Sequence, residues 1–200
     1  EAEKFEVKAF KYNADVSDSK QVSEMFQYMD KHLGDIDILV NNAGIAQNAP
    51  ITEMTDEQWD KMIKVHLYGN FYNCREAAKR MLKRNKGKIV NISSDLGSLG
   101  CEEYAHYSAA KGGINAFTKS LARELAPHIN VNAVAPGATF TDILAEFGDN
   151  YVEEESAKYP LKRLAQPEEI AKSVLFLASS CADFYTGQIL GPNGGGVMNG

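Results

Sequence analysis

The chain has little of what marks a disulfide-bonded, metal-binding or membrane-spanning protein. Its three cysteines, Cys74, Cys101 and Cys181, are widely spaced, odd in number and outside any CxxC pattern. Such spacing favours neither a disulfide framework nor a zinc site. The four histidines show no HxxxH or HxH spacing, so no metal is expected. No stretch approaches the roughly 20 apolar residues needed to span a bilayer. A reducing cytoplasm is the predicted location.

Excess basic charge is also missing. The formal net charge is −6 and the sequence pI is near 5.3, which disfavours nucleic acid and anionic membranes as partners. The most basic stretch, residues 79–88, is interpreted as the solvated end of a helix, where the helix dipole favours cations. What remains is the composition of a soluble globular protein, with 44% hydrophobic and 24% charged residues. A single domain over residues 1–200 is predicted.

Apolar segments alternate along the chain with helix-length amphipathic segments. Strands are predicted at 5–16, 35–44, 87–94, 129–137 and 186–195, and helices at 18–33, 55–84, 104–126 and 166–180. Segment 35–44 (DIDILVNNAG) is typical of a strand buried on both faces. Strands separated by helices form βαβ units with right-handed crossovers. The predicted fold is therefore α/β, a doubly wound parallel sheet of Rossmann type.

The residues that follow the predicted strands are candidates for a binding site, because ligands of such sheets lie beyond the carboxyl ends of the strands. Most of these residues are small or turn-forming, which lets a flat ligand approach the backbone closely. The sets lie at 15–16, 41–44, 93–94 and 135–137.

Residues 107–113 read YSAAKGG and place Tyr107 and Lys111 four positions apart, on one face of a helix. A free Tyr has a pKa near 10, but a cation about 4 Å away at an effective dielectric of about 20 contributes roughly 4 kcal/mol, or about three pKa units. Tyr107 is therefore predicted to titrate toward neutrality and to exchange a proton with a carbonyl or alcohol oxygen. Ser94 would donate a second hydrogen bond to that oxygen. The small residues around Lys111 are expected to leave room for a bulky ligand.

A YxxxK pair also occurs by chance, with a half-buried Tyr and a surface Lys, so the surrounding motifs decide the interpretation. In order, the chain carries LVNNAG (39–44), ISSDLG (92–97), YSAAK (107–111), NAVAPG (132–137), PEEIA (167–171) and TGQ (186–188). This ordered set resembles the short-chain dehydrogenase/reductase family. Within the family it looks most like the group around the 3-oxoacyl-(acyl-carrier-protein) reductases and related sugar and alcohol dehydrogenases. The resemblance runs from about residue 5 to the C-terminus.

The resemblance implies an oxidoreductase that interconverts a ketone and a secondary alcohol with NAD or NADP. Tyr107 would be the general acid/base, Lys111 would lower its pKa and bind the nicotinamide ribose, and Ser94 would hold the substrate oxygen. The cofactor-binding residues that it implies are Asp15 and Val16 at the adenine, Asn42, Ala43 and Gly44 along the adenosine, and Pro136, Gly137, Thr139 and Thr141 near the nicotinamide amide and the phosphates. Tyr107 and Lys111 are implied to contact the cofactor as well. Asn41 is interpreted as a structural bridge between strands.

One departure from the family pattern lies in KVHLYG, where His66 stands in place of an Asn. In the family, that Asn is credited with holding a water in the proton relay behind the Lys. An imidazole also accepts and donates hydrogen bonds, and it titrates near neutrality. His66 is therefore expected to keep the relay, with a merely structural histidine as the alternative.

A second departure concerns the glycine-rich pyrophosphate turn, which should precede residue 5. The sequence opens on EAEKFEV without an initiator Met, so the turn and its βαβ segment are expected to be omitted from the sequence; a truncated molecule is the alternative, and a signal peptide is left open. The cluster GPNGGG (191–196) is predicted to be a C-terminal turn, because a phosphate loop needs a helix behind it.

Substrate and assembly are less readable. Residues 142–162 are predicted to form a substrate lid. Phe140, which precedes it, and Leu144, Phe147 and Tyr151 within it are expected to line an apolar pocket or to pack the lid. The substrate is expected to be a small carbonyl or alcohol compound. The resemblance implies a homotetramer built partly from residues 60–84 and 104–126. Two rival functions stay open: a non-catalytic dinucleotide sensor or scaffold on the same fold, and a structural fragment that assembles with another chain.

Overall fold

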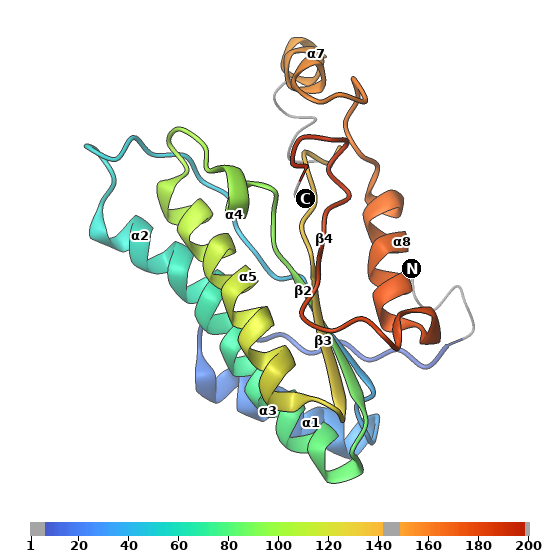
Figure 1. The fold of residues 1–200 in the computed structure, drawn as a ribbon. Helices are drawn as coiled ribbons and strands as arrows, with labels where there is room; N and C mark the ends of the chain where they lie inside the picture. Colours follow the sequence, from blue (N-terminus) through green and yellow to red (C-terminus); the bar gives the residue numbers. More distant parts are fainter. Residues whose placement is uncertain (1–6, 142–148, 199–200) are drawn as a thin grey trace.

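A parallel four-stranded sheet organises the structure, a computed structural model that describes residues 7–141 and 149–198, without the side chains of 149–151. Its strands are β1 (Ile38–Asn41), β2 (Gly87–Ile92), β3 (Ile129–Val134) and β4 (Ile189–Leu190), in the spatial order β1-β2-β3-β4. All pairings are parallel. Helices α1 (Ser19–His32), α3 (Gly69–Arg84) and α5 (Ala105–Leu125) cover one face, and α8 (Pro167–Ala178) covers the other (Figure 1). The predicted α/β fold is confirmed.

Local capping signals set the helix boundaries. Asp18 accepts hydrogen bonds from two backbone N–H groups at the start of α1. Thr55 and Gln58 form a capping box at the start of α2 (Asp56–Ile63), and Asn85 ends α3 in the left-handed conformation. Gln166 opens α8, with Pro at its first position. The remaining short elements are α4 (Leu96–Leu99), α7 (Asp149–Lys158) and η3 (Ser180–Ala182).

The predicted helix over 55–84 contains a defect. A π-helical turn, η2 (Lys64–Tyr68), separates α2 from α3 and carries His66. Apolar periodicity does not reveal one extra residue in a helix, so the sequence predicted an unbroken helix. Such π-turns occur frequently at functional sites.

The strand predicted over 5–16 is wrong for the part that the structure describes. Residues 7–15 are irregular, and Val7 is 57% exposed. The segment instead runs past α1, where Lys8 Nζ donates a hydrogen bond to His32 O at 3.2 Å and Tyr12 contacts Tyr28. Alternating apolar residues fit a strand only when a neighbouring strand supplies hydrogen-bond partners, and none pairs with this segment among the described residues.

The expectation that 35–44 is buried on both faces is also wrong. β1 pairs with β2, and Ile38 and Val40 are 46% and 41% exposed. Within the described ranges β1 is an edge strand, so only one of its edges is hydrogen-bonded. Its last residue, Asn41, is buried, and Asn41 Nδ2 donates to Asn91 Oδ1 on β2 at 2.9 Å. The predicted bridging role of Asn41 is therefore confirmed.

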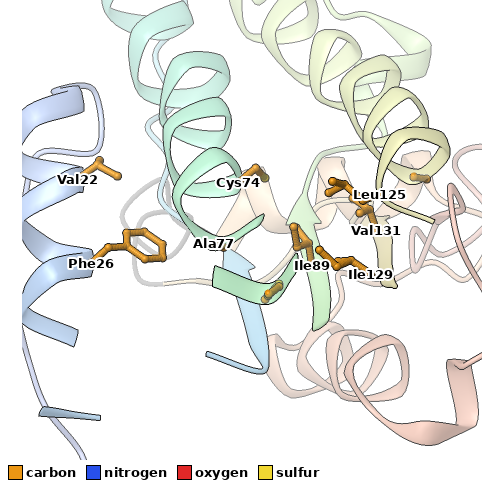
Figure 2. Packing of buried hydrophobic residues seen from close by; sticks show 10 residues of the cluster. Val22, Phe26, Cys74, Ala77, Ile89, Leu125, Ile129 and Val131 are labelled. Atoms are coloured by element: carbon orange, nitrogen blue, oxygen red, sulfur yellow. The ribbon is translucent and has the colours of Figure 1, made fainter. Parts of the chain in front are cut away.

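The main hydrophobic core lies between the sheet and the helices α1, α3 and α5. Figure 2 shows Val22 and Phe26 of α1 packing toward α3, and Ile89 and Val131 of the sheet packing beneath α3 and α5. A second cluster joins α8 to β2 and β3. The main core fixes α5 against β3, so the N-terminal half of α5 projects beyond the carboxyl ends of the strands (Figure 1).

The last two features of the fold are the turn at residues 191–196 and the lengths of the helices. Residues 191–196 form a turn in which Gly194 and Gly195 have positive φ, and Asn193 Oδ1 accepts a hydrogen bond from Gly195 N at 3.0 Å. The predicted C-terminal turn is therefore confirmed. Among the helices of 7–141 and 149–198, none has both the length and the apolar character that crossing a bilayer requires.

Candidate active site

Ser94, Tyr107 and Lys111 meet at the carboxyl end of β2. Ser94 lies just beyond β2, and Tyr107 and Lys111 lie in the first two turns of α5. Ser93 Oγ donates to Lys111 O at 3.1 Å, which ties the strand end to the helix. Tyr107 contacts the Ser94 side chain, an interaction that acts to lower the Tyr107 pKa. Three of the four residues that the sequence suggested as catalytic therefore form one cluster, and the fourth, His66, lies beside Tyr107.

The glycines after Lys111 serve packing rather than ligand access. A Cβ at Gly112 would lie 3.1 Å from Gly97 O of α4, and a Cβ at Gly113 would lie 3.2 Å from the Leu67 side chain of η2. The expectation that this part of the helix leaves room for a bulky ligand is wrong at these two positions. Their small size instead lets α4 and the π-turn pack closely against α5.

Lys111 is a buried cation. Its side chain is 5% exposed, and Nζ donates a hydrogen bond to Ile92 O at 2.8 Å. Nζ also lies 5.5 Å from the centroid of the Tyr107 ring. Burial disfavours the charged ammonium and lowers the pKa of Lys111 to about 8. An ammonium has three N–H donors, so those not bound to Ile92 O are available to a ligand.

The shift of the Tyr107 pKa is opposite in direction to the sequence-based prediction. Burial raises it above the ordinary value, and the Asp95 carboxylate raises it further, against the opposing effect of Ser94. The predicted Coulomb effect assumed an ammonium about 4 Å from the phenol oxygen, whereas the ammonium of Lys111 is bonded to Ile92 O. At neutral pH the phenol of Tyr107 is therefore protonated, the form that a general acid needs.

His66 lies beside Tyr107 with the two rings in edge-to-face contact, 5.3 Å between centroids. Its Nε2 lies 2.7 Å from Ile45 O and 3.1 Å from Ile45 N. The side chain is 1% exposed, and Nδ1 has no hydrogen-bond partner among the described residues. Burial, then the charge of Lys111, lowers the pKa of His66 to about 4. The ring is neutral near pH 7, so the expectation that it titrates near neutrality is wrong.

A His66→Asn variant is expected to lose part of the acid sensitivity of the fold. The folded-state pKa of about 4 lies below the ordinary 6.5, so the unfolded chain binds the proton first as the pH falls. Stability is full above pH 6.5 and decreases toward pH 4, by about 3 kcal/mol. Urea unfolding at pH 7 and pH 4.5 should show a smaller difference for His66→Asn than for the wild type. The exposed His128 provides the control His128→Asn, and equal differences in all three proteins would contradict the prediction.

The residues assigned to the adenosine side follow β1 or precede α1. Asp15 is exposed and accepts hydrogen bonds from Ser17, and Val16 packs at the start of α3, where a Cβ at Gly69 would lie 3.0 Å from Val16 Cγ2. Asn42, Ala43 and Gly44 are exposed. A Cβ at Gly44 would lie 2.6 Å from His66 Cε1, so only glycine fits there.

The residues assigned to the nicotinamide side follow β3. Pro136 O accepts a hydrogen bond from Asp95 N at 3.0 Å, which brings the ends of β2 and β3 together. Thr139 Oγ1 donates to Gly137 O at 3.0 Å, and Thr141 is exposed. The structure therefore places Pro136 next to Asp95, one residue from Ser94, and the roles of Pro136, Gly137, Thr139 and Thr141 toward a cofactor stay predictions.

Two polar residues at this site were given no role from the sequence. Asp95 is 4% exposed and faces Tyr159, whose Oη lies 3.4 Å from Asp95 Oδ2. Ala138 N donates to Tyr159 Oη at 3.0 Å, and burial raises the pKa of Tyr159 to about 12. The ring of Tyr159 packs on glycine: a Cβ at Gly196 would lie 2.9 Å from it. The position of Asp95 directly after the serine pair was the one available signal for its role.

Taken together, the fold and the site define a class, an α/β oxidoreductase with a Ser-Tyr-Lys set at the carboxyl ends of its strands. Residues 1–196 match the family described as Enoyl-(Acyl carrier protein) reductase. The chain is 39% identical over 195 residues to the 3-oxoacyl-(acyl-carrier-protein) reductase of Aquifex aeolicus, covering 97% of this chain and 79% of the relative. The same enzyme of Thermotoga maritima is 39% identical over 199 residues, covering 99% and 81%. The chain belongs to the short-chain dehydrogenase/reductase family, as its motifs predicted.

Solved structures agree with this assignment. ElxO with NADP bound is similar with a TM-score of 0.89 and 35% identity, covering 92% of this chain and 77% of that one. A short-chain dehydrogenase/reductase from Brucella melitensis, described as a glucose/ribitol dehydrogenase, has a TM-score of 0.87 and 36% identity, covering 94% and 76%. The chain is accordingly an NAD(P)-dependent oxidoreductase, and the predicted enzyme class and cofactor are confirmed.

Proposed function

We propose that the protein reduces a ketone to a secondary alcohol with NADH or NADPH, and that its substrate is a 3-oxoacyl thioester. The observation that carries the proposal is the convergence of Ser94, Tyr107 and a buried Lys111 at one strand end. The 3-oxoacyl reductases at 39% identity support the thioester. The resemblance to a glucose/ribitol dehydrogenase supports a carbonyl or alcohol substrate more generally.

The site suits the nicotinamide half of the cofactor. A ribose hydroxyl offers acceptors for Lys111, whose buried ammonium has one acceptor, Ile92 O, resolved within the described ranges. Pro136 and Gly137 would border the nicotinamide, with Thr139 and Thr141 toward the phosphates. The residues that would hold the adenosine half are Asp15, Val16, Asn42, Ala43 and Gly44. When bound, the nicotinamide supplies or accepts a hydride.

The protein's own residues then handle the substrate oxygen. Protonated Tyr107 donates a proton to that oxygen as negative charge develops on it, and Ser94 donates a hydrogen bond. Lys111, beside the Tyr107 ring, stabilises the tyrosinate that is left. Neutral His66, beside Tyr107, hydrogen-bonds to the backbone of Ile45. In this proposal His66 holds one end of the relay that returns a proton to Tyr107.

The proposal is tested by titrating the purified protein with NADH and NADPH and then assaying turnover with acetoacetyl coenzyme A. Micromolar binding and ketone-dependent oxidation of one dinucleotide support it. Binding of a dinucleotide without turnover of any ketone supports the rival sensor or scaffold. If a folded sample binds neither dinucleotide, the enzyme proposal for this chain is overturned, and the remaining hypothesis is a structural fragment that assembles with another chain.

Assembly, lid and location are further parts of the proposal. Tyr68 at the end of η2 and Phe71 of α3 are exposed, and the guanidinium of Arg75 lies 5.0 Å from the Phe71 centroid. Such aromatic and Arg groups are enriched at interfaces, which supports a homotetramer built partly from 60–84 and 104–126; sedimentation measures the mass. A cytoplasmic location and a single domain over 1–200 remain predictions.

The lid predicted at 142–162 is described only in part. Helix α7 and the residues after it lie within that range, and Tyr159 connects them to Asp95. Leu144, Phe147 and the side chain of Tyr151 lie outside the described residues. Phe140 is described and is exposed. Its place in an apolar pocket remains a prediction.

A further inference from the structure

The Ser94 hydroxyl is already engaged before any substrate arrives. Ser94 Oγ donates to Asp95 Oδ1 at 3.0 Å and accepts from Leu96 N at 3.2 Å. Ser94 and Asp95 are 7% and 4% exposed, so water does not compete strongly for either group. A hydroxyl has one proton, so Asp95 Oδ1 competes for it with Tyr107, which also hydrogen-bonds the Ser94 side chain.

Asp95 is held firmly in the position that captures this proton. Its Oδ1 accepts a second hydrogen bond from Leu96 N at 2.8 Å, and its own N–H donates to Pro136 O at 3.0 Å. Its Oδ2 is more loosely bound, 3.4 Å from Tyr159 Oη. A hydrogen bond to an ionised carboxylate is roughly twice as strong as one between neutral groups. The proton of Ser94 is therefore less available to a neutral substrate carbonyl while Asp95 is ionised.

We infer that Asp95 is a positioning residue that sets whether the Ser94 hydroxyl can donate to the substrate oxygen. This inference rests on the proposed function, in which that oxygen lies between Ser94 and Tyr107. Ionised Asp95 holds the Ser94 proton and slows ketone reduction. Protonated Asp95 no longer attracts that proton strongly, and Ser94 turns to the substrate oxygen.

Among the residues that the structure describes, four other titratable groups act on Asp95 or are acted on by it. They are Tyr107 of α5, Glu155 of α7, Tyr159 after α7, and Cys101 in the loop before α5. Burial raises the pKa of Asp95, Glu155 raises it further, and hydrogen bonds from Ser94, Leu96 and Tyr159 lower it. Because the net effect raises the Asp95 pKa, the pH at which the Ser94 hydroxyl changes its hydrogen-bond partner lies above the ordinary range of an Asp.

The test is the steady-state reduction of acetoacetyl coenzyme A by Asp95→Asn and wild type across pH. Asn keeps the acceptor for Leu96 N but not the charge, so kcat should rise about fivefold at high pH, with little change in KM. The ratio of the two kcat values should fall toward one at low pH, where wild-type Asp95 is protonated. Glu153→Gln is the control: it removes an exposed charge from α7 without touching Ser94 or Asp95, and its kcat relative to wild type should vary little with pH. A ratio of one at every pH, or a uniformly slower Asp95→Asn, overturns the inference.

A second measurement needs no turnover and so separates this inference from the proposed function. The carboxyl carbon of Asp95 is titrated by NMR in wild type and in Ser94→Ala, with Asp95→Asn to assign the signal. Loss of the Ser94 donor should raise the Asp95 pKa, because donation to the charged form lowers it. Equal pKa values in the two proteins overturn the inference, even if the protein reduces ketones. If it reduces none, the proposed function fails while this measurement still decides whether Asp95 holds the Ser94 proton.

Discussion

Replacing Tyr107 by Phe is expected to lower kcat for ketone reduction by about 10²- to 10⁴-fold, the usual contribution of a general acid, and to leave the Kd for the dinucleotide nearly unchanged. Phe keeps the ring that packs edge-to-face against His66 and Tyr104. It removes only the hydroxyl that contacts Ser94. Burial keeps that hydroxyl protonated in the free protein, so Tyr107→Phe removes the group that would donate the proton.

Tyr104→Phe is the matched control, since Tyr104 lies on the same side of α5 with its ring 6.2 Å from that of Tyr107. It is expected to retain most of the wild-type kcat. Titration with NADH or NADPH should give similar affinities for both variants, and circular dichroism should show that both are folded. Normal turnover by Tyr107→Phe would rule out Tyr107 as the proton donor. Loss of dinucleotide binding in that variant would assign Tyr107 to the cofactor site instead.

Features carried by contiguous residues were predictable from the sequence. The caps at Asp18 and Thr55 and the left-handed Asn85 satisfy helix ends with nearby side chains or backbone, so they are visible in a short window. The four-residue spacing of Tyr107 and Lys111 places both on one face of any helix. The position of Ser94 beside them was implied by the resemblance to the short-chain dehydrogenase/reductases.

Features that depend on distant neighbours were not predictable. The segment 5–16 alternates as a strand does, yet strand formation requires a partner that the sequence pattern does not supply. The π-turn at 64–68 inserts one residue into an amphipathic helix, and it carries His66, which contacts Gly44 and Ile45. The pKa of Tyr107 depends on burial and on Asp95, and neither was known before the fold.

The roles of Asp95 and Tyr159 show the same limit over a longer distance. They are separated by 64 positions, and their contact arises because the glycines at 137 and 196 admit the Tyr159 ring above the strand ends. Glycine in a loop has many uses, so the sequence alone could not assign these glycines to one tyrosine. The contact between Asp95 and Tyr159 could therefore be recognised only in the tertiary structure.

Replacing Lys111 by Met is expected to impair both cofactor binding and chemistry, unlike Tyr107→Phe. Met preserves much of the aliphatic stem but has no ammonium to stabilise the tyrosinate or to bind a ribose hydroxyl. We expect kcat/KM to fall by at least about 10²-fold and the dinucleotide Kd to rise measurably. Lys119→Met, at an exposed position of the same helix, is the control and should behave as wild type.

The same variant makes a prediction about stability that does not depend on activity. The Lys111 pKa is about 8 in the folded protein against an ordinary 10.5, so the unfolded chain binds more protons between these values. The free energy of unfolding should therefore rise with pH across that window, by up to about 3 kcal/mol. Urea unfolding at pH 8 and pH 10 should show this contribution in wild type and in Lys119→Met, and not in Lys111→Met. If Lys111→Met keeps the full rise, the ammonium is not buried as the structure shows, and its role beside Tyr107 must be reassigned.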